Sequence, residues 1–151
     1  MELKSLLIEP KEKTPKIDLN QLTGDLILSG RSIPENASEV YEKVLTWTNE
    51  YIKSPRLTTN FRLNLEYFNT ASSIWITKIV KALCSIKGSE YTLLIHLYFD
   101  IEDYENLEVE DIREALGPLV AIITTAKISL GIKICETNDK EEIIKESMVL
   151  I

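Results

Sequence analysis

The chain has 151 residues, of which 44% are hydrophobic, and a formal net charge of −7. This length supports one domain with its own core and is short for two. The negative charge disfavours nucleic-acid backbones and anionic membranes as partners, because both require a basic footprint. Cys84 and Cys135 lie far apart in apolar runs. They predict buried thiols in a reducing compartment and not a disulfide framework.

No segment predicts export or membrane insertion. Residues 1–13 mix charged and apolar side chains and lack the uninterrupted hydrophobic region of a signal peptide. The most apolar window, residues 116–134, contains Pro118, Lys127 and Lys133, which makes it a poor membrane span. We therefore expect a cytoplasmic protein.

Strand-like and helix-like segments alternate along most of the chain. After a lead-in over residues 1–13, which allows a loosely attached strand, strands are expected over 14–19, 26–28, 59–67, 91–99 and 128–134. Helices are expected over 37–53, 72–87, 109–116 and 139–146, and residues 119–126 fit either state. This order predicts one α/β domain over residues 14–151, with an N-terminal β-hairpin and a mixed sheet flanked by helices.

Two local features refine this outline. Overlapping capping-box patterns, Ser32 with Glu35 and Asn36 with Glu39, predict the start of the first helix. The strand over 91–99 is apolar on both faces, which predicts a central position in the sheet.

Three hydroxyl side chains crowd the junction between the strand over 59–67 and the next helix. Thr70, Ser72 and Ser73 lie near a predicted helix N-terminus, where unpaired backbone N–H groups and the helix dipole favour negative charge. They indicate a place for an anionic ligand or for a covalently attached phosphate. The alternative is that one hydroxyl caps the helix and the others have no special role.

The aromatic residues at this junction leave two interpretations open. Phe68 shares strand parity with Glu66 on the polar face, so a strand that continues through it exposes an aromatic ring beside Thr70. Such a ring is typical of an interaction surface. If the chain instead turns at Tyr67, Phe68 enters the core.

Motifs for nucleotide binding, metal binding and hydrolysis are absent from the sequence, so no cofactor or metal is expected. The only histidine, His96, lies in the predicted central strand, which favours a buried, hydrogen-bonded side chain over a catalytic base. Asp100 and Glu102 begin an acidic run without the glycine that a calcium loop needs. A solvated acidic loop is the simpler interpretation, and an enzyme that uses Asp100 or Glu102 with His96 is the alternative.

Three segments in order resemble the SiaC family of bacterial regulatory phosphoproteins. They are residues 14–20, the stretch from Thr23 that ends in GRSIPENA (residues 30–37), and LEYFNTASS (residues 65–73). The resemblance implies a fold similar to anti-sigma-factor antagonists of the STAS type. It implies a non-enzymatic signalling protein that is phosphorylated on Thr70 by a kinase and dephosphorylated by a PP2C-like phosphatase. The unphosphorylated form would bind and activate a diguanylate cyclase, which raises cyclic di-GMP and favours biofilm.

We expect partner contacts at this junction, on Tyr67, Phe68, Asn69, Ser72 and Ser73. The resemblance implies that Arg31 reaches the same corner and pairs with a phosphate, and an ordinary surface arginine is the alternative. The sequence departs from the family at Ala71, where serine is common, and in an atypical C-terminal extension from about residue 116. These departures leave open the identity of the partner. A small anion- or ligand-binding α/β module without phosphorylation is the alternative function.

Overall fold

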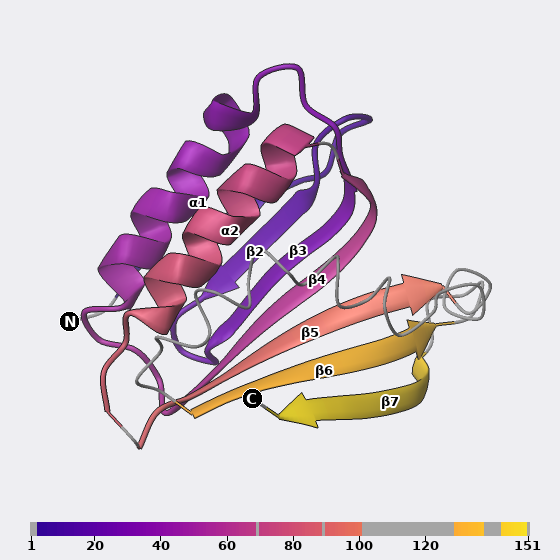
Figure 1. Cartoon of the computed structure of the whole chain (residues 1–151). Helices are drawn as coiled ribbons and strands as arrows, with labels where there is room; N and C mark the ends of the chain where they lie inside the picture. Colours follow the sequence, from indigo (N-terminus) through magenta and orange to yellow (C-terminus); the bar gives the residue numbers. More distant parts are fainter. Residues whose placement is uncertain (1–2, 69, 89, 101–128, 138–142, 151) are drawn as a thin grey trace.

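The computed structural model describes residues 3–68, 70–88, 90–100, 129–137 and 143–150 (Figure 1). Its strands form one seven-stranded sheet in which the spatial order follows the chain order. The strands are β1 (Leu6–Ile8), β2 (Lys16–Asn20), β3 (Asp25–Ser32), β4 (Thr58–Phe68), β5 (Thr92–Asp100), β6 (Ser129–Thr137) and β7 (Ile143–Leu150). Strands β3 to β6 pair in parallel, and the outer pairs are antiparallel, so the sheet is mixed.

Two helices, α1 (Ala37–Tyr51) and α2 (Thr70–Cys84), pack side by side on one face of the sheet (Figure 1). Helix α1 connects β3 to β4, and α2 connects β4 to β5, each between parallel neighbours. Parallel crossovers are almost always right-handed. Two successive crossovers that step in the same direction therefore place their helices on the same face of the sheet.

The core fills the space between this sheet face and the two helices. Alternate residues of β2 to β5 point into it, and each helix contributes one stripe of side chains, which is the pattern expected of a two-layer domain. Its largest fully buried side chains are Tyr41, Tyr51, Phe61, Ile17, Leu19, Leu26, Leu28, Ile79, Leu83, Leu93 and Ile95. The mixed α/β sheet and the N-terminal hairpin predicted from the sequence are confirmed.

Element boundaries agree within a few residues in the first hundred residues, except that the strand expected over 26–28 continues as β3 to Ser32. The lead-in contains the short edge strand β1, and α2 begins at Thr70 and ends at Cys84, a few residues before the predicted limits. Asn36 precedes α1 as expected, but its side chain does not cap the helix and instead accepts a hydrogen bond from the Ser38 hydroxyl at 2.7 Å. In the described part of the chain, no helix combines the length and apolar character needed to span a lipid bilayer.

The prediction for the C-terminus was wrong in one element. The helix expected over 139–146 is replaced by strand β7, which pairs antiparallel with β6. The charged residues of this segment favour a helix locally, but pairing with the open edge of β6 supplies backbone hydrogen bonds that override that preference. The strand expected over 128–134 is confirmed as β6. The helix expected over 109–116 and the ambiguous residues 119–126 lie outside the described residues.

Candidate functional site

The hydroxyl-rich junction lies where β3 and β4 end and α2 begins (Figure 1). Ser32 at the end of β3 pairs with Phe68 at the end of β4, and α2 starts two residues later at Thr70. Thr70 is therefore the first residue of a 15-residue helix. The sequence-based placement of these hydroxyl residues at a helix N-terminus is confirmed.

An irregularity in the β3–β4 pairing changes the strand parity at this junction. Gly30 pairs with Leu65 but Arg31 pairs with Tyr67, so Glu66 is an extra residue in β4. Gly30 has a φ of +99°, a backbone conformation that glycine adopts without strain. Strand β4 does continue through Phe68, but parity counted across the bulge no longer assigns Phe68 to a face.

Beneath the junction, three buried hydroxyl groups form one hydrogen-bonded network. The side chains of Ser32, Tyr41 and Ser72 are fully buried. The Ser32 hydroxyl donates to Ser72 Oγ at 2.8 Å, and the Ser72 hydroxyl donates to the Ser32 carbonyl oxygen at 2.9 Å. Because the Ser32 hydrogen is used in this way, the phenol of Tyr41 donates to Ser32 Oγ. Burial raises the pKa of the Tyr41 phenol, an effect that the hydrogen-bonding hydroxyl groups of this network partly offset.

This network ties together three elements that are distant in sequence. Ser32 ends β3, Tyr41 lies in the first half of α1, and Ser72 lies in the first turn of α2. The first turn of α2 is therefore held to the sheet from below, two residues after Thr70. Strand parity contained a signal for this arrangement, because Ser32 shares its face of β3 with Leu26 and Leu28.

Two expectations for these serines change as a result. Ser72 was expected on a partner-binding surface, but it has no exposed area with which to contact a partner. Ser32 was expected to cap a helix, but it is the last residue of β3 and bonds to Tyr41 and Ser72. Both side chains support the junction from inside.

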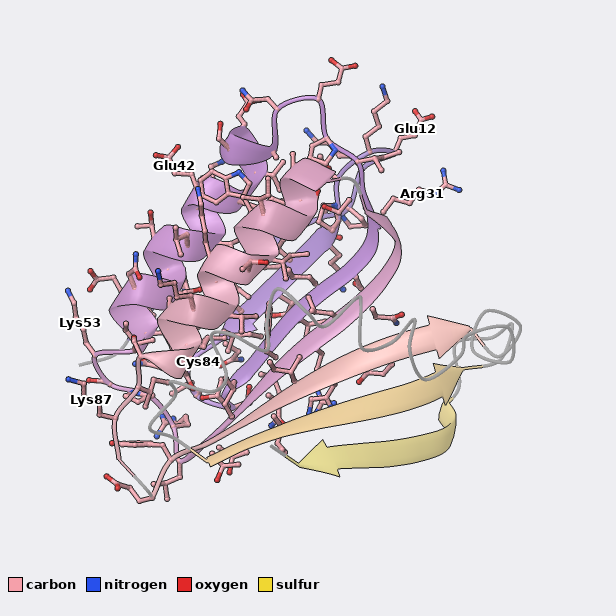
Figure 2. All side chains as sticks on the ribbon, viewed as in Figure 1. Glu12, Arg31, Glu42, Lys53, Cys84 and Lys87 are labelled. Carbon is pink, nitrogen blue, oxygen red and sulfur yellow. The ribbon has the colours of Figure 1, made fainter. Side chains whose placement is uncertain are left out.

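The described surface around the junction carries both charged and apolar groups. Arg31 is exposed, and Figure 2 shows it projecting outward at the end of β3. Ile33 and Ile74 are exposed apolar residues, at 37% and 53% of their surface respectively. The side chains of Tyr67, Phe68, Asn69, Thr70 and Ser73 lie outside the described part of the structure.

His96 belongs to a separate polar cluster on β4 and β5. It is 3% exposed, and its Nε2 lies 2.8 Å from Asn60 Oδ1 while its Nδ1 lies 3.4 Å from an Arg62 nitrogen. Arginine only donates hydrogen bonds, so Nδ1 accepts and Nε2 carries the hydrogen, which makes the imidazole neutral. Arg62 also donates to the Tyr98 hydroxyl at 3.1 Å and lies 3.6 Å from the Asp25 carboxylate.

This geometry agrees with the interpretation of His96 as a buried, hydrogen-bonded side chain. The Asp100 side chain and Glu102, its suggested catalytic partners, lie outside the described residues. Among the residues that the structure describes, no group of three or more His, Cys, Asp or Glu side chains lies close enough to hold a metal ion. Cys84 is buried and free, and burial raises its thiol pKa to about 11, as expected of a core thiol.

The fold and the junction define a class of small α/β proteins with solved members. Apo-SiaC from Pseudomonas aeruginosa superposes with a TM-score of 0.64 at 20% identity and covers 86% of this chain and 98% of its own. A second structure of SiaC from Pseudomonas aeruginosa superposes with a TM-score of 0.63 at 20% identity, and the match covers 85% of this chain and 96% of that one. A third structure is that of the diguanylate cyclase SiaD in complex with its activator SiaC, also from Pseudomonas aeruginosa. It superposes with a TM-score of 0.65 at 23% identity, and the match covers 84% of this chain and 97% of that one.

The chain belongs to the SiaC family. The family model for SiaC family regulatory phosphoproteins matches residues 8–123, which is a longer stretch than the motifs alone suggested. No curated protein sequence matches this chain. It is therefore a member of a regulatory phosphoprotein family whose solved structures include one bound to a diguanylate cyclase.

Proposed function

We propose that this chain is a non-enzymatic signalling switch controlled by phosphorylation of Thr70. In its unphosphorylated form it binds and regulates a partner of the diguanylate cyclase class. A kinase adds the phosphate and a PP2C-like phosphatase removes it. Membership of a regulatory phosphoprotein family supports this proposal, as does a structural relative that activates a diguanylate cyclase.

The observation that carries the proposal is the position of Thr70 as the first residue of α2. Phosphate adds about −1.5 to −2 charges at neutral pH. A helix N-terminus favours such a charge by about 0.3–1 kcal/mol, because its first N–H groups have no partner within the helix. The network of Ser32, Tyr41 and Ser72 holds the same turn to the sheet from inside. We therefore expect phosphorylation to leave the fold intact.

The effect of the phosphate would be felt at the surface. Two exposed apolar residues flank this junction: Ile33 directly follows β3, and Ile74 lies in the second turn of α2. A partner that covers them would have to desolvate the phosphate or pair it, and an unpaired buried charge costs several kcal/mol. Since each 1.4 kcal/mol changes affinity tenfold, a loss of a hundredfold or more is expected without refolding.

Arg31 is the proposed cation for the phosphate in the free protein. It is exposed and pairs across the strands with Tyr67, three residues before Thr70. Arginine is suited to this role because its planar guanidinium binds phosphate through two hydrogen bonds. Replacing Arg31 with Ala is expected to speed dephosphorylation by a purified PP2C-like phosphatase, whereas Arg31→Lys should have a smaller effect.

The test compares unphosphorylated protein, authentic Thr70 phosphoprotein and Thr70→Glu in two measurements. Melting temperature should be almost the same in all three, and affinity for the host's diguanylate cyclase should fall strongly with the added charge. Thr46→Glu is the matched control, because Thr46 is an exposed threonine in the middle of α1. Equal affinity in all forms, or unfolding of the phosphoprotein, would contradict the proposal.

Intact mass spectrometry of protein purified from its native host tests the modification itself. A phosphorylated species should be present in the wild type and absent after Thr70→Ala. If the phosphate persists in the Thr70→Ala variant, another residue carries it and the proposed site is wrong.

A further inference from the structure

The outward face of α2 combines apolar and basic side chains that reach the surface. Helix α2 contains no acidic residue, and its lysines, Lys78 and Lys81, are both exposed. Ile74 is 53% exposed, and the half-buried indole of Trp75 lies beneath the Lys78 ammonium, 4.4 Å from the ring centroid. Residues 74, 78 and 81 are spaced four and three apart, so they lie on one side of the helix.

The outward face of α2 carries lysines without any acidic residue, whereas the exposed surface of α1 carries Lys43 together with several glutamates. The chain carries a formal charge of −7, and the neighbouring helix α1 exposes Glu39, Glu42 and Glu50. Figure 2 shows Glu42 pointing outward from α1, on the same layer as α2. The outward face of α2 therefore offers apolar side chains with two lysines beside them. This pattern complements a partner surface whose apolar side chains are flanked by carboxylates.

The same face begins at the proposed phosphorylation site. Thr70 precedes Ile74 by four residues in a continuous helix, so position 70 lies at the head of the stripe formed by 74, 78 and 81. With a rise of about 1.5 Å per residue, position 70 lies roughly 12 Å along the axis from Lys78. A phosphate on Thr70 would therefore join this surface without contacting Lys78 directly.

We propose that the α2 face, defined as Ile74, Trp75, Lys78 and Lys81, docks an acidic amphipathic segment of the regulated partner. Apolar side chains of the segment cover Ile74 and Trp75, and its carboxylates lie beside Lys78 and Lys81. This inference rests on the proposed function, since it names the chemistry of the partner at the phosphorylated end of α2. It also supplies a second reason for release, because a phosphate at position 70 repels the carboxylates of the incoming segment.

The occupant is a protein segment and not a polyanion. Two lysines on one helix are far fewer than the basic footprint by which nucleic acids or anionic membranes are bound. Ile74 and the Trp75 indole, in contrast, offer the apolar and aromatic anchor typical of a protein interface.

The experiment measures association and dissociation rates for each diguanylate cyclase purified from the host, at low and high salt. Lys78→Glu with Lys81→Glu should lower the affinity at least tenfold, chiefly through slower association, and should flatten its salt dependence. Ile74→Ser should speed dissociation at least fivefold. Lys78→Arg keeps the charge and the ring contact and should bind like the wild type, and Lys43→Glu on exposed α1 should change the affinity less than twofold.

The outcomes separate this inference from the proposed function. If phosphorylation of Thr70 releases the cyclase but the α2 variants bind like the wild type, the docking face is wrong and the switch stands. If the α2 variants weaken binding and phosphorylation does not, the docking face stands and the switch is wrong. If no cyclase of the host binds at either salt concentration, both fall. The proposal that the occupant is an acidic protein segment is also refuted in two other cases. One is wild-type binding that strengthens at high salt, and the other is tight binding to anionic vesicles or RNA in place of a cyclase.

Discussion

Replacing Ser72 with Ala tests whether the buried hydroxyl network holds the first turn of α2. The change removes the acceptor of the Ser32 hydroxyl at 2.8 Å and the donor to the Ser32 carbonyl at 2.9 Å. Both groups are fully buried, so water cannot replace the lost partners. Leaving a buried polar group unsatisfied costs about 1–3 kcal/mol. We therefore expect the free energy of unfolding to fall by about 2–3 kcal/mol.

Tyr41→Phe is the matched comparison within the same network. It removes one donor, yet the Ser32 hydroxyl still donates to Ser72. The expected loss is about 0.5–1.5 kcal/mol, the net value of one hydrogen bond. Because the two residues share one network, the double variant should lose less than the sum of the single losses.

Urea unfolding followed by circular dichroism gives these free energies, and melting temperature gives a second estimate at about 2–4 °C per kcal/mol. Ser38→Ala serves as the control, because Ser38 is exposed and, among the described residues, its hydroxyl bonds to the Asn36 side chain alone. It should stay within about 0.5 kcal/mol of the wild type. A Ser72→Ala protein as stable as the Ser38→Ala control, or a Tyr41→Phe loss as large as that of Ser72→Ala, would refute the directed network.

Three further predictions concern other parts of the fold. Gly24 has a φ of +74°, and a Cβ there would lie 2.5 Å from the Thr58 carbonyl oxygen. Gly24→Ala should therefore lower the free energy of unfolding, measured in urea, by about 1–3 kcal/mol. The pKa of the Cys84 thiol is about 11 in the folded protein and about 8.5 in the unfolded chain. The unfolded chain therefore loses the thiol proton first, so the stability that the buried neutral thiol contributes is complete below about pH 8.5 and is lost as pH rises through about 11. Stability should therefore decline more steeply between pH 9 and 11 in the wild type than in Cys84→Ala. Trp47 Nε1 donates to the Lys4 carbonyl at 2.8 Å, so Trp47→Phe should cost about 0.5–1.5 kcal/mol and speed amide exchange in β1.

Each of these has a result that would count against it. Gly30→Ala is the control for Gly24→Ala, since Gly30 also has a positive φ but, apart from its chain neighbours, no atom of the described residues lies within 4 Å of its added Cβ. If both variants lose the same stability, the close approach at Gly24 contributes nothing. Equal pH slopes for the wild type and Cys84→Ala would contradict the raised thiol pKa. Unchanged exchange in Trp47→Phe would show that β1 is held by its pairing with β2 alone.

Short-range periodicity was sufficient for the central elements. The alternation around Phe61 and the helical spacing around Ile79 predicted β4 and α2, because each pattern is complete within a dozen residues. The burial of His96 followed from its apolar neighbours in the same way. The sequence also placed Thr70 near a helix N-terminus, and the structure makes it the first residue of α2.

The sequence alone determined the alternating α/β order, the placement of Thr70 near a helix N-terminus and the resemblance to the SiaC family. Only the tertiary structure decided that residues 143–150 form a strand, that Glu66 is an extra residue in β4, and that Ser72 is buried against Ser32. Each of these depends on a partner in another strand or helix, and the two serines lie 40 residues apart. Local patterns report which face of an element is apolar, whereas register and buried hydrogen bonds are set by the element that packs against it.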